Sequence, residues 1–520
     1  MLKPLPIGIQ TFRDIIKGGF LYVDKTQYIY ELIRSPKGVY FLSRPRRFGK
    51  SLLVSTLAEI FAGNRELFQG LWLYDSPYNW EKHPVIRIDF SLYQVKSAAE
   101  LQRSIKTHLR RIAREHQVSL GEGEYHEQFA ELILELAAQK QVVILIDEYD
   151  KPLIDNIENV PEAQRIREVL KGFYTVIKGM DAYVRFALLT GISKFSRVGV
   201  FSGLNNLVDL TLNERFATAL GLTEAEIRDN LKEHITAFAQ KEGITTDEVV
   251  QQLRRWYNGF CFAGGGQNVY NPFSTFLLFY HQHFSNYWFE SGTPTFLIKL
   301  IKERNYDIQQ FDQLMLEELA FSTYEIENLA IVPLLFQTGY LTIKGYDPQK
   351  RLYRLYYPNY EVENAFLTYL LSAFSEIEHA LSSGHLWRLI EALQAGNLET
   401  FFDTLKIFFA QIPYTIQLKA EKYYQTIFYL LFTLIGLRVE AEVTTNVGRI
   451  DAVIELEKNV FIFEFKLDGS EQTALEQIKT AEYYQRYRRA RKAIHLVGVN
   501  FATQQRGVAG WLVERIADEG

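Results

Sequence analysis

A short segment rich in basic residues is the first stretch of the sequence whose residue types and spacing could do chemistry. It reads SRPRRFGKSLL over residues 43–53, with Gly49, Lys50 and Ser51 near its end. In a phosphate-binding loop, backbone N–H groups at a helix N-terminus bind phosphate oxygens, the lysine adds positive charge, and the serine holds Mg²⁺. A complete loop has glycine six positions before the lysine, where this sequence has Arg44. The tripeptide alone therefore leaves nucleotide binding open.

An acidic pair about a hundred residues later favours nucleotide binding. The segment QVVILIDEYD is an apolar strand that ends in Asp147 and Glu148. At the carboxyl end of a buried strand, the first carboxylate can hold Mg²⁺ and the second can activate the attacking water. The alternative is a strand that simply ends in polar residues. In the later segment ALLTGISKFS, Thr190 or Ser193 lies at the end of a predicted strand or just after it, and its polar side chain could sense the γ-phosphate there.

Strands and helices alternate through the first two hundred residues, and these elements must position both groups. The strand segments are continuously apolar, which is typical of a parallel sheet covered by helices on both faces. We predict strands over residues 38–45, 85–90, 142–148 and 184–191. Helices are predicted directly after the lysine, within 97–139 and over 161–180. The sequence therefore predicts an α/β domain with the basic and acidic groups at strand ends.

Beyond about residue 215 the pattern becomes mostly helical. Helices are expected over 222–290 and 325–338, followed by two short strands, YLTIKGY and RLYRLYY. A helix followed by a hairpin resembles a winged-helix module. Helices dominate again from 361 to about 435. For the end of the chain we predict a hairpin over 447–467, a helix over 471–490, the strand KAIHLVGVN and a final helix.

The predicted hairpin near the C-terminus carries the second group that could do chemistry, Asp451, Glu464 and Lys466. A two-residue turn at 457–458 would place Asp451 opposite Glu464, and a turn at 458–459 would place it opposite Lys466. Any even-length loop keeps all three on one face. An ordinary hairpin with its charged face in water is the alternative. The flanking residues are apolar, which predicts a central strand where an unpaired charge would be costly.

Several segments together resemble the AAA-ATPase-like family of prokaryotic proteins. These segments are FLSRPRRFGKSLL, ILIDEYDKP, LLTGISKFS with FSGLNNLVDLT, and WYNGF…VYNPFS. In that family RPRRFGKS is the usual phosphate loop, so Arg44 departs from the general loop and not from the family's. The resemblance covers roughly residues 1–290 and implies an AAA-like fold that binds ATP and Mg²⁺, with hydrolysis implied less firmly. The nucleotide-binding residues would be Arg47, Phe48, Gly49, Lys50, Ser51, Leu52, Asp147 and Thr190, with Ser51 and Asp147 on the metal and Glu148 catalytic.

The C-terminal group resembles the PD-(D/E)xK nuclease superfamily, in the form commonly fused to that module. This resemblance covers roughly residues 385–520 and implies Mg²⁺-dependent phosphodiester cleavage. The metal ligands that it implies are Asp451, Glu464 and, from the preceding helix, Glu421. Lys466 would position or activate the attacking water, and Gln477 sits where related nucleases have a polar helix residue. The proline that names the motif is absent, since Ile450 precedes Asp451, and this is common in the superfamily.

Length and composition limit the remaining possibilities. The 520 residues suggest roughly three domains, which we place at 1–215 (AAA-like), 216–384 (helical, resembling a winged helix) and 385–520 (nuclease-like). The net charge of −5 excludes a general polyanion binder, so nucleic acid must contact a local patch. The basic, tyrosine-rich run YYQRYRRARK, 483–492, is a candidate for this patch, or it is a solvated helix face.

The chain is expected to be cytoplasmic. It has one cysteine, Cys261, which excludes disulfides within the chain and fits a reducing compartment. The longest apolar stretch, residues 426–437, is too short for a bilayer, which needs about 20 residues. We therefore expect no membrane partner.

The sequence as a whole predicts an α/β multidomain protein: a P-loop, AAA-like parallel sheet, a helical middle, and a C-terminal α/β domain of the restriction-endonuclease kind. ATP bound with Mg²⁺ would control a metal-dependent nuclease acting on DNA, or on RNA. The partners expected are nucleic acid and further copies of the chain, because AAA-like modules often form rings. One alternative is a nucleotide-switched DNA-binding or sensor protein without nuclease activity. Another is ATP binding without hydrolysis.

Overall fold

The structure of the chain, a computed structural model, divides into two compact units. The N-terminal unit comprises residues 1–293 and 313–362, and the C-terminal unit comprises 294–312 and 363–520. The residues that the structure describes are 2–193, 200–201, 203–204, 206–290, 295–304, 306, 308–322, 330–412, 421–439, 442–445, 451–482, 484–490, 492–502, 504–505 and 507–516.

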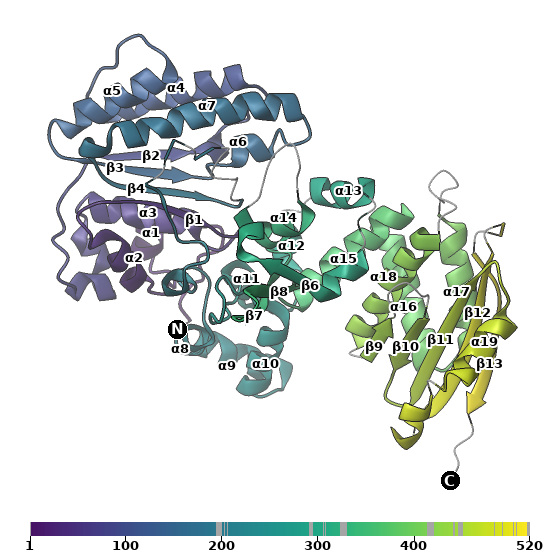
Figure 1. Ribbon diagram of the computed structural model, residues 1–520. Coiled ribbons are helices and arrows are strands. Elements are labelled where there is room, and N and C mark those ends of the chain that lie inside the picture. Colours follow the sequence, from purple (N-terminus) through teal and green to yellow (C-terminus); the bar gives the residue numbers. More distant parts are fainter. Residues whose placement is uncertain are drawn as a thin grey trace. The chain divides into compact units, whose positions relative to one another are not determined.

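A five-stranded parallel sheet forms the centre of the N-terminal unit (Figure 1). Its strands, in spatial order, are β2 (Val85–Asp89), β3 (Val142–Asp147), β4 (Val184–Gly191), β1 (Gly38–Ser43) and β5 (Val208–Asp209). Every pair of neighbours is parallel. The four predicted strands are confirmed. The central strands β3 and β4 are apolar runs buried on both faces of the sheet, whereas the edge strand β2 alternates buried residues with exposed or half-buried ones. Strand β4 lies between β1 and β3, so the carboxyl ends of all three meet at one edge.

Helices cover both faces of this sheet (Figure 1). On one face lie α1 (Phe12–Lys17), α2 (Thr26–Ile33) and α3 (Lys50–Phe61). On the other lie α4 (Ala98–Glu115), α5 (Tyr125–Ala137) and α7 (Val160–Gly179), while the short α6 (Lys151–Ile154) follows β3 directly. The core between α3 and the sheet is made of aliphatic and aromatic side chains from α1, α2, α3 and the strands.

A helical group follows the sheet in the sequence and packs on the N-terminal segment. Its helices are α8 (Glu224–Asn230), α9 (Lys232–Glu242), α10 (Thr246–Tyr257), α11 (Pro272–His281) and α12 (Tyr287–Glu290). Leu21 from the N-terminal segment belongs to its core. Local capping sets the helix starts: Thr223 and Thr245 form capping boxes, and Asn271 caps α11 ahead of Pro272.

A small antiparallel sheet with one helix completes the N-terminal unit. The helix is α14 (Ile331–Thr338), and the sheet has the order β6 (Leu314–Glu317), β8 (Leu352–Tyr356), β7 (Thr342–Asp347). The predicted hairpin of β7 and β8 is confirmed, and the described part of the predicted helix is α14. Strand β6 was not predicted, because four residues carry too little periodicity to identify a strand.

The C-terminal unit is built on a mixed five-stranded sheet. Its order is β13 (Gly507–Ile516), β12 (Ala493–Ala502), β11 (Asn459–Leu467), β10 (Asp451–Glu455) and β9 (Glu442–Thr445). Only β11 and β12 are parallel neighbours; the other three pairs are antiparallel. The prediction of a final helix is wrong, because that segment is β13. Its sequence, GVAGWLVERI, suits a helix locally, but a ten-residue ladder with β12 decides the outcome.

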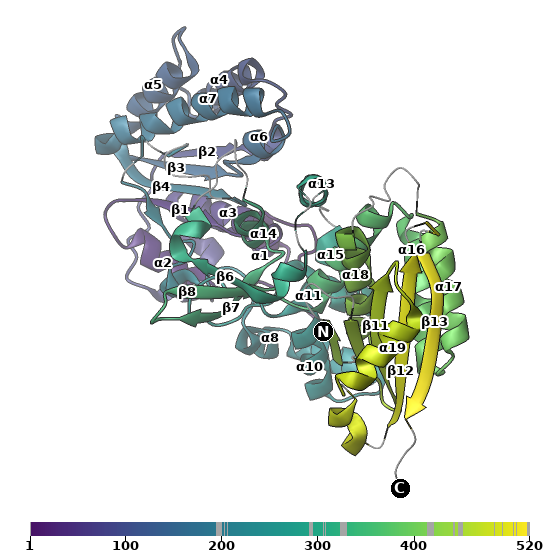
Figure 2. The ribbon, with the colours of Figure 1, turned by 45° about the vertical axis from the view of Figure 1, so that its right-hand side comes forward.

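Helices cover this sheet on both faces (Figure 2). The helices of the unit are α13 (Thr295–Glu303), α15 (Tyr360–Ser375), which begins in the N-terminal unit, α16 (His379–Gln394), α17 (Leu398–Ala410), α18 (Glu421–Val439) and α19 (Glu471–Thr480). Helix α19 packs on one face, and aromatic side chains of α17 and α18 pack on the other. Helix α19 is shorter than predicted, and Glu482, just beyond it, has left-handed backbone with φ 49°.

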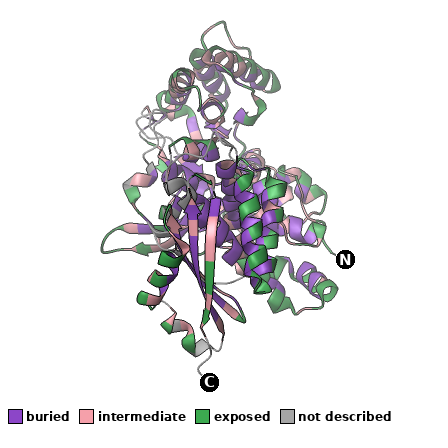
Figure 3. Ribbon diagram, turned by 90° about the vertical axis from the view of Figure 1, so that its right-hand side faces the viewer, coloured by how far each residue is buried: buried purple, intermediate pink, exposed green. Residues whose placement is uncertain are grey.

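Burial across the molecule follows the layered arrangement. Helices carry exposed residues on one side and buried residues on the other (Figure 3). Among the described residues, no helix is both long enough and apolar enough to cross a membrane.

Candidate functional site

The predicted phosphate loop connects β1 to the N-terminus of α3. Gly49, with φ 93°, is the N-cap of α3, and its left-handed backbone suits glycine. Arg47 also has a positive φ, 66°, which is unfavourable for a residue with a side chain. Lys50 and Ser51 then occupy the first turn of the helix, where backbone N–H groups lack partners within the helix. The local structure therefore has the form of an anion-binding helix terminus.

Arg44, which takes the place of the first loop glycine, is part of the protein interior. Its guanidinium donates hydrogen bonds to the carbonyls of Ser43 (2.8 Å), Thr211 (2.9 Å) and Phe216 (3.0 Å). It also stacks over the ring of Phe262, 4.2 Å from its centroid. Arg44 is 1% exposed. Its side chain thus holds the start of the loop onto neighbouring segments.

Lys50 is folded back over the loop that precedes it. Its ammonium donates to the carbonyl oxygens of Arg44 (2.9 Å) and Pro45 (3.0 Å), and the residue is 6% exposed. Burial lowers the pKa of Lys50, while the carboxylates of Glu148 and Asp147 act in the opposite direction. The acidic pair therefore lies close enough to act electrostatically on this lysine.

The acidic pair sits where β3 ends, beside β4. The hydroxyl of Thr190 donates to Asp147 Oδ1 at 2.6 Å, and both residues are buried. Glu148 has a φ of 49°, and its own N–H also donates to Asp147 Oδ1, at 3.0 Å. Left-handed backbone at a non-glycine residue costs on the order of 1–3 kcal/mol and clusters at functional sites. Burial raises the pKa of Glu148, and Lys50 opposes this shift.

Asp150 is a site residue that the sequence analysis did not single out. It is fully buried, and its Oδ2 accepts hydrogen bonds from the Ser193 backbone (2.6 Å), the Ser193 hydroxyl (2.5 Å) and the Ile192 backbone (3.1 Å). Burial raises the pKa of Asp150, and the bonds from Ser193 oppose the shift. Asp150 thus fixes the segment after β4 against the end of β3. The signal in the sequence that could have identified Asp150 is its place as the third acidic residue of the segment DEYD.

A cleft of about 460 Å³ joins most of these residues. Its walls include Arg46, Arg47, Gly49, Lys50, Ser51, Leu52, Glu148 and Lys151 from the loop and strand ends, and Pro6, Gly8, Pro272 and Phe273 from the N-terminal segment and α11. The guanidinium of Arg47 stacks over Phe273, 4.7 Å from its centroid. Among the predicted nucleotide residues, Phe48, Asp147 and Thr190 do not line the cleft. Asp147 and Thr190 are buried at the ends of β3 and β4 and are bonded to each other.

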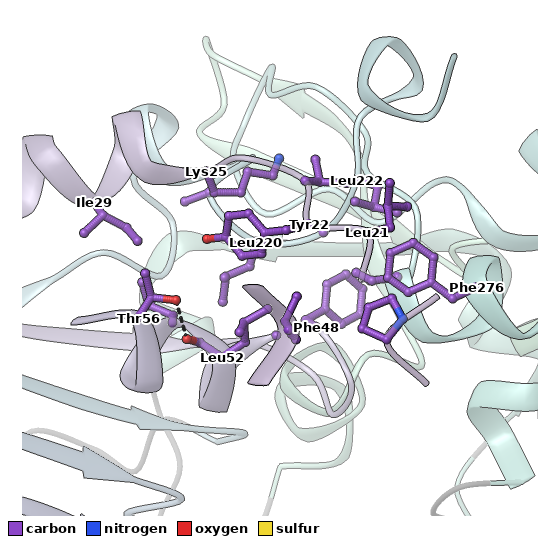
Figure 4. Close-up of a pocket in the computed structure, with 18 residues that line it drawn as sticks. Leu21, Tyr22, Lys25, Ile29, Phe48, Leu52, Thr56, Leu220, Leu222 and Phe276 are labelled. Atoms are coloured by element: carbon purple, nitrogen blue, oxygen red, sulfur yellow. Dashed lines mark hydrogen bonds between the residues drawn. The ribbon is translucent and has the colours of Figure 1, made fainter. Parts of the chain in front are cut away.

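A smaller apolar pocket opens beside the cleft (Figure 4). It has a volume of about 100 Å³, and it shares six lining residues with the cleft: Pro6, Ile15, Gly49, Leu52, Pro272 and Phe276. Its other walls are mainly apolar side chains, among them Leu21, Val23, Ile29, Phe48, Leu220 and Leu222. The Lys25 ammonium, at its edge, is held by Glu226 and by the carbonyl of Thr218. The two spaces together could take a ligand with an apolar part and an anionic part.

The C-terminal group is brought together by the β10–β11 hairpin. Asp451 pairs directly with Glu464 across the two strands, and a bond from Leu456 N to Asn459 O (2.8 Å) closes the turn. The structure therefore has the first of the two registers that the sequence allowed. Side chains at directly opposite positions of an antiparallel pair project from the same face of the sheet.

Glu464 and Lys466 lie beneath helix α19 and not on a solvated face. Glu464 is 1% exposed, and its Oε1 accepts a hydrogen bond from Lys466 Nζ at 3.0 Å. The same ammonium donates to Gln477 Oε1 of α19. On the opposite face, Phe463 and Phe465 stack in the aromatic core. The alternative of a water-facing hairpin is therefore excluded for Glu464.

The metal ligands are only partly within the described structure. Among the described side chains, no group of three or more His, Cys, Asp or Glu residues is placed to hold a metal ion. The side chains of Asp451 and Glu421 lie outside the described set, as does Ile450; Glu421 is the first residue of α18. Glu464 fits a hard cation by its chemistry, since carboxylate oxygens are the ligands that Mg²⁺ prefers.

In the basic, tyrosine-rich run over residues 483–492, the ammonium of Lys492 forms an ion pair with the carboxylate of Glu455, with 2.7 Å between Nζ and Oε1.

Comparison with known proteins gives three findings. A family model described as "Predicted AAA-ATPase" matches residues 6–201. A model described as "PD-(D/E)XK nuclease superfamily" matches residues 419–511. A protein of Azotobacter chroococcum mcd 1, called "Uncharacterized protein in vnfD 5'region", is 40% identical over 537 aligned positions, which cover 99% of each chain.

Proposed function

The chain belongs to the family of this Azotobacter protein, with an N-terminal predicted AAA-ATPase domain and a C-terminal PD-(D/E)XK nuclease superfamily domain, and from this premise we propose that ATP controls its cleavage of nucleic acid. The substrate proposed is DNA in preference to RNA. The observation that carries the proposal is the buried Glu464, bonded to Lys466 and opposite Asp451 on the neighbouring strand.

The cleft of the N-terminal unit suits a nucleoside triphosphate. Gly49, Lys50 and Ser51 would hold the β- and γ-phosphates through helix N–H groups, the ammonium and the hydroxyl. The adjacent apolar pocket would receive the base, because moving an aromatic ring from water into an apolar pocket is favourable. Ser51 and Asp147 would hold the Mg²⁺, which neutralises charge on the phosphates when it is bound.

Within this cleft Glu148 is the residue we assign to water activation. It lines the cleft together with Lys50 and Ser51, whereas Asp147 does not line the cleft and accepts a hydrogen bond from Thr190. A general base must be ionised, and burial raises the pKa of Glu148 above the usual carboxylate value of 4.5. Activity should therefore rise with pH as Glu148 loses its proton, at a pH above that usual value.

Glu148→Gln is expected to lower ATP turnover about 10²-fold or more, because general-base catalysis contributes about 10²–10⁴-fold. ATP affinity should stay nearly unchanged, since glutamine keeps the size of the side chain. Phosphate release and binding of a fluorescent ATP analogue measure the two quantities, and the acid limb of the wild-type pH profile should lie above pH 4.5. Equal turnover in both proteins would show that Glu148 is not the base.

In the C-terminal unit, Asp451 and Glu464 would hold a divalent ion, whose chemistry when bound is to acidify water and to neutralise charge on the scissile phosphate. Lys466 would orient the attacking water and place its positive charge beside the same phosphate. Gln477 supports this role, because its amide oxygen accepts from the lysine and limits where the ammonium can lie. Glu464 Oε1 accepts a hydrogen bond from the same Nζ.

Cleavage by the purified full chain tests the proposal. Supercoiled plasmid, linear duplex, single-stranded DNA and RNA are incubated with Mg²⁺ or Mn²⁺, with and without ATP. We expect metal-dependent cleavage whose rate changes with ATP. If no substrate is cut under any of these conditions, the alternative of a nucleotide-switched DNA-binding or sensor protein replaces the proposal. Cleavage that ignores ATP would retain the nuclease and remove its control by the nucleotide.

A further inference from the structure

A tryptophan from a distant segment is hydrogen-bonded to the phosphate loop. The indole Nε1 of Trp288, in α12, donates a hydrogen bond to the carbonyl of Arg46 at 3.0 Å, and the residue is 5% exposed. Gly339, at the end of α14, packs against the same place. A Cβ at Gly339 would come within 2.7 Å of Pro45 and 3.3 Å of the Trp288 ring. Two segments far along the chain therefore hold the loop.

The carbonyls of three consecutive loop residues are all held in this conformation. Lys50 holds those of Arg44 and Pro45, and Trp288 holds that of Arg46. A phosphate in the cleft would compete for the Lys50 ammonium, which is strongly attracted to anions. Loss or weakening of the lysine bonds would change the peptide groups next to Arg46. Trp288 is therefore placed to respond to phosphate binding.

A buried carboxyl group links Trp288 to two helices. Glu361 Oε1 accepts a hydrogen bond from the Trp288 backbone N–H at 2.6 Å, and Oε2 accepts from the Ser274 hydroxyl at 2.9 Å. Ser274 lies in α11, whose first turn, with Pro272, lines the nucleotide cleft. Glu361 is fully buried and is the second residue of α15. One carboxyl group thus joins α11, α12 and the start of α15.

Helix α15 continues from this junction into the other unit. The boundary between the units falls between Val362 and Glu363, inside the helix, which runs to Ser375. A continuous helix keeps its internal hydrogen bonds when its end moves, so displacement of its first turn is transmitted along its axis. The junction at Glu361 is therefore well placed to carry a change from the phosphate loop toward the C-terminal unit.

We propose that Trp288 and Glu361 are positioning residues that couple the state of the phosphate loop to helix α15, and through it to the C-terminal unit. The inference rests on the proposed control of the nuclease by ATP, and it names the residues through which that control passes. A coupling of this kind requires that the contacts differ between the nucleotide-free and nucleotide-bound states. The Lys50 and Trp288 bonds to neighbouring carbonyls are the contacts that phosphate binding would change.

Hydrogen exchange of the full chain, measured with and without ATP and Mg²⁺, tests the coupling without use of nuclease activity. In the wild type, ATP should change deuterium uptake in peptides that cover residues 360–375. Trp288→Phe removes the indole N–H and keeps an aromatic ring in place. This variant should bind a fluorescent ATP analogue within about threefold of the wild type, since its cleft is intact, yet lose most of the uptake change in α15.

The matched control is Trp256→Phe, which makes the same change in α10. The ring of Trp256 packs on that of Tyr360, the first residue of α15, with the centroids 4.5 Å apart. The substitution therefore alters packing at the start of α15 and leaves the bond from Trp288 to Arg46 in place. This variant should keep the wild-type response. Glu361→Gln should keep most of it too, because burial raises the pKa of Glu361 to about 8 and a neutral amide resembles the protonated acid. Glu361→Ala should lose it.

Two results would overturn the coupling. In the first, Trp288→Phe keeps the full ATP response in α15. In the second, the wild type binds ATP and α15 does not respond, which leaves the proposed nucleotide site intact and removes only the coupling. A wild-type chain that fails to bind ATP would instead refute the proposed function itself, and the inference with it.

Discussion

Lys466→Ala is expected to lower the rate of phosphodiester cleavage about 10²–10³-fold, the usual cost of losing a pre-positioned group that stabilises developing charge. The ammonium is held between Glu464 and Gln477, so its place in the site is set before substrate binds. Asp451→Ala should have the larger effect and abolish cleavage, because it removes a proposed ligand of the metal ion. Initial rates on the best substrate, in excess Mg²⁺, measure both effects.

The control for this variant lies in the same helix layer. Lys479, on α19, has a side chain that is 40% exposed, and it pairs with Glu514 of β13. Lys479→Ala removes the same charge from the unit and should keep the cleavage rate within about threefold, because exposed ion pairs contribute little. Similar losses in the two variants would mean that general charge, and not a positioned ammonium, supports cleavage. An unchanged rate in Lys466→Ala would remove Lys466 from the mechanism.

Lys50→Met is expected to weaken ATP binding by roughly 30-fold or more, because the loss of a buried, hydrogen-bonded charge costs about 2–5 kcal/mol. The methionine keeps the length of the side chain, and the bound triphosphate loses its nearest cation. Thermal stability is measured beside affinity, because methionine avoids the desolvation cost of a buried ammonium but gives up the Lys50 hydrogen bonds to the carbonyls of Arg44 and Pro45. Titration with a fluorescent ATP analogue and thermal unfolding measure the two effects.

Lys140→Met provides the comparison for Lys50. Lys140 is partly exposed and pairs with Glu81, so its loss changes the net charge equally without touching the cleft. ATP affinity should then remain within about twofold of the wild type. If Lys50→Met binds ATP as well as the wild type does, Lys50 does not contact the phosphates. In that case the proposed nucleotide site is wrong.

Local sequence pattern predicted the elements whose residues are apolar on both sides. Strands β1 to β4 fall within the expected ranges. Strands β1, β3 and β4 are continuous apolar runs bounded by polar or turn residues, and β2 alternates apolar residues with Arg87 and Asp89. The same reasoning failed for β13, whose residues suit a helix as well as a strand. Its conformation comes from pairing with β12, and such pairing depends on distant residues.

The phosphate loop shows where local reasoning reached its limit. Residue types predicted that Gly49, Lys50 and Ser51 lie at a helix N-terminus, and in the structure α3 begins there; that this terminus binds phosphate stays a prediction. The hydrogen bonds of Arg44 could not be predicted from the sequence, because the partners Thr211 and Phe216 lie more than 160 residues away along the chain. The same holds for Asp150, whose importance follows from its bonds to the segment after β4.

By itself, the sequence determined which chemical groups are available and which elements carry them: a lysine and a serine at a helix start, acids at the end of a buried strand, and an Asp, Glu and Lys set on a hairpin. Only the tertiary structure decided that Asp451 pairs with Glu464 in the strand register, that Glu464 is buried beneath α19, and that Trp288 reaches the carbonyl of Arg46, 242 residues away. The physical reason is that residue type and periodicity act over a few residues. Burial and hydrogen bonding between distant segments are settled only when the whole chain packs.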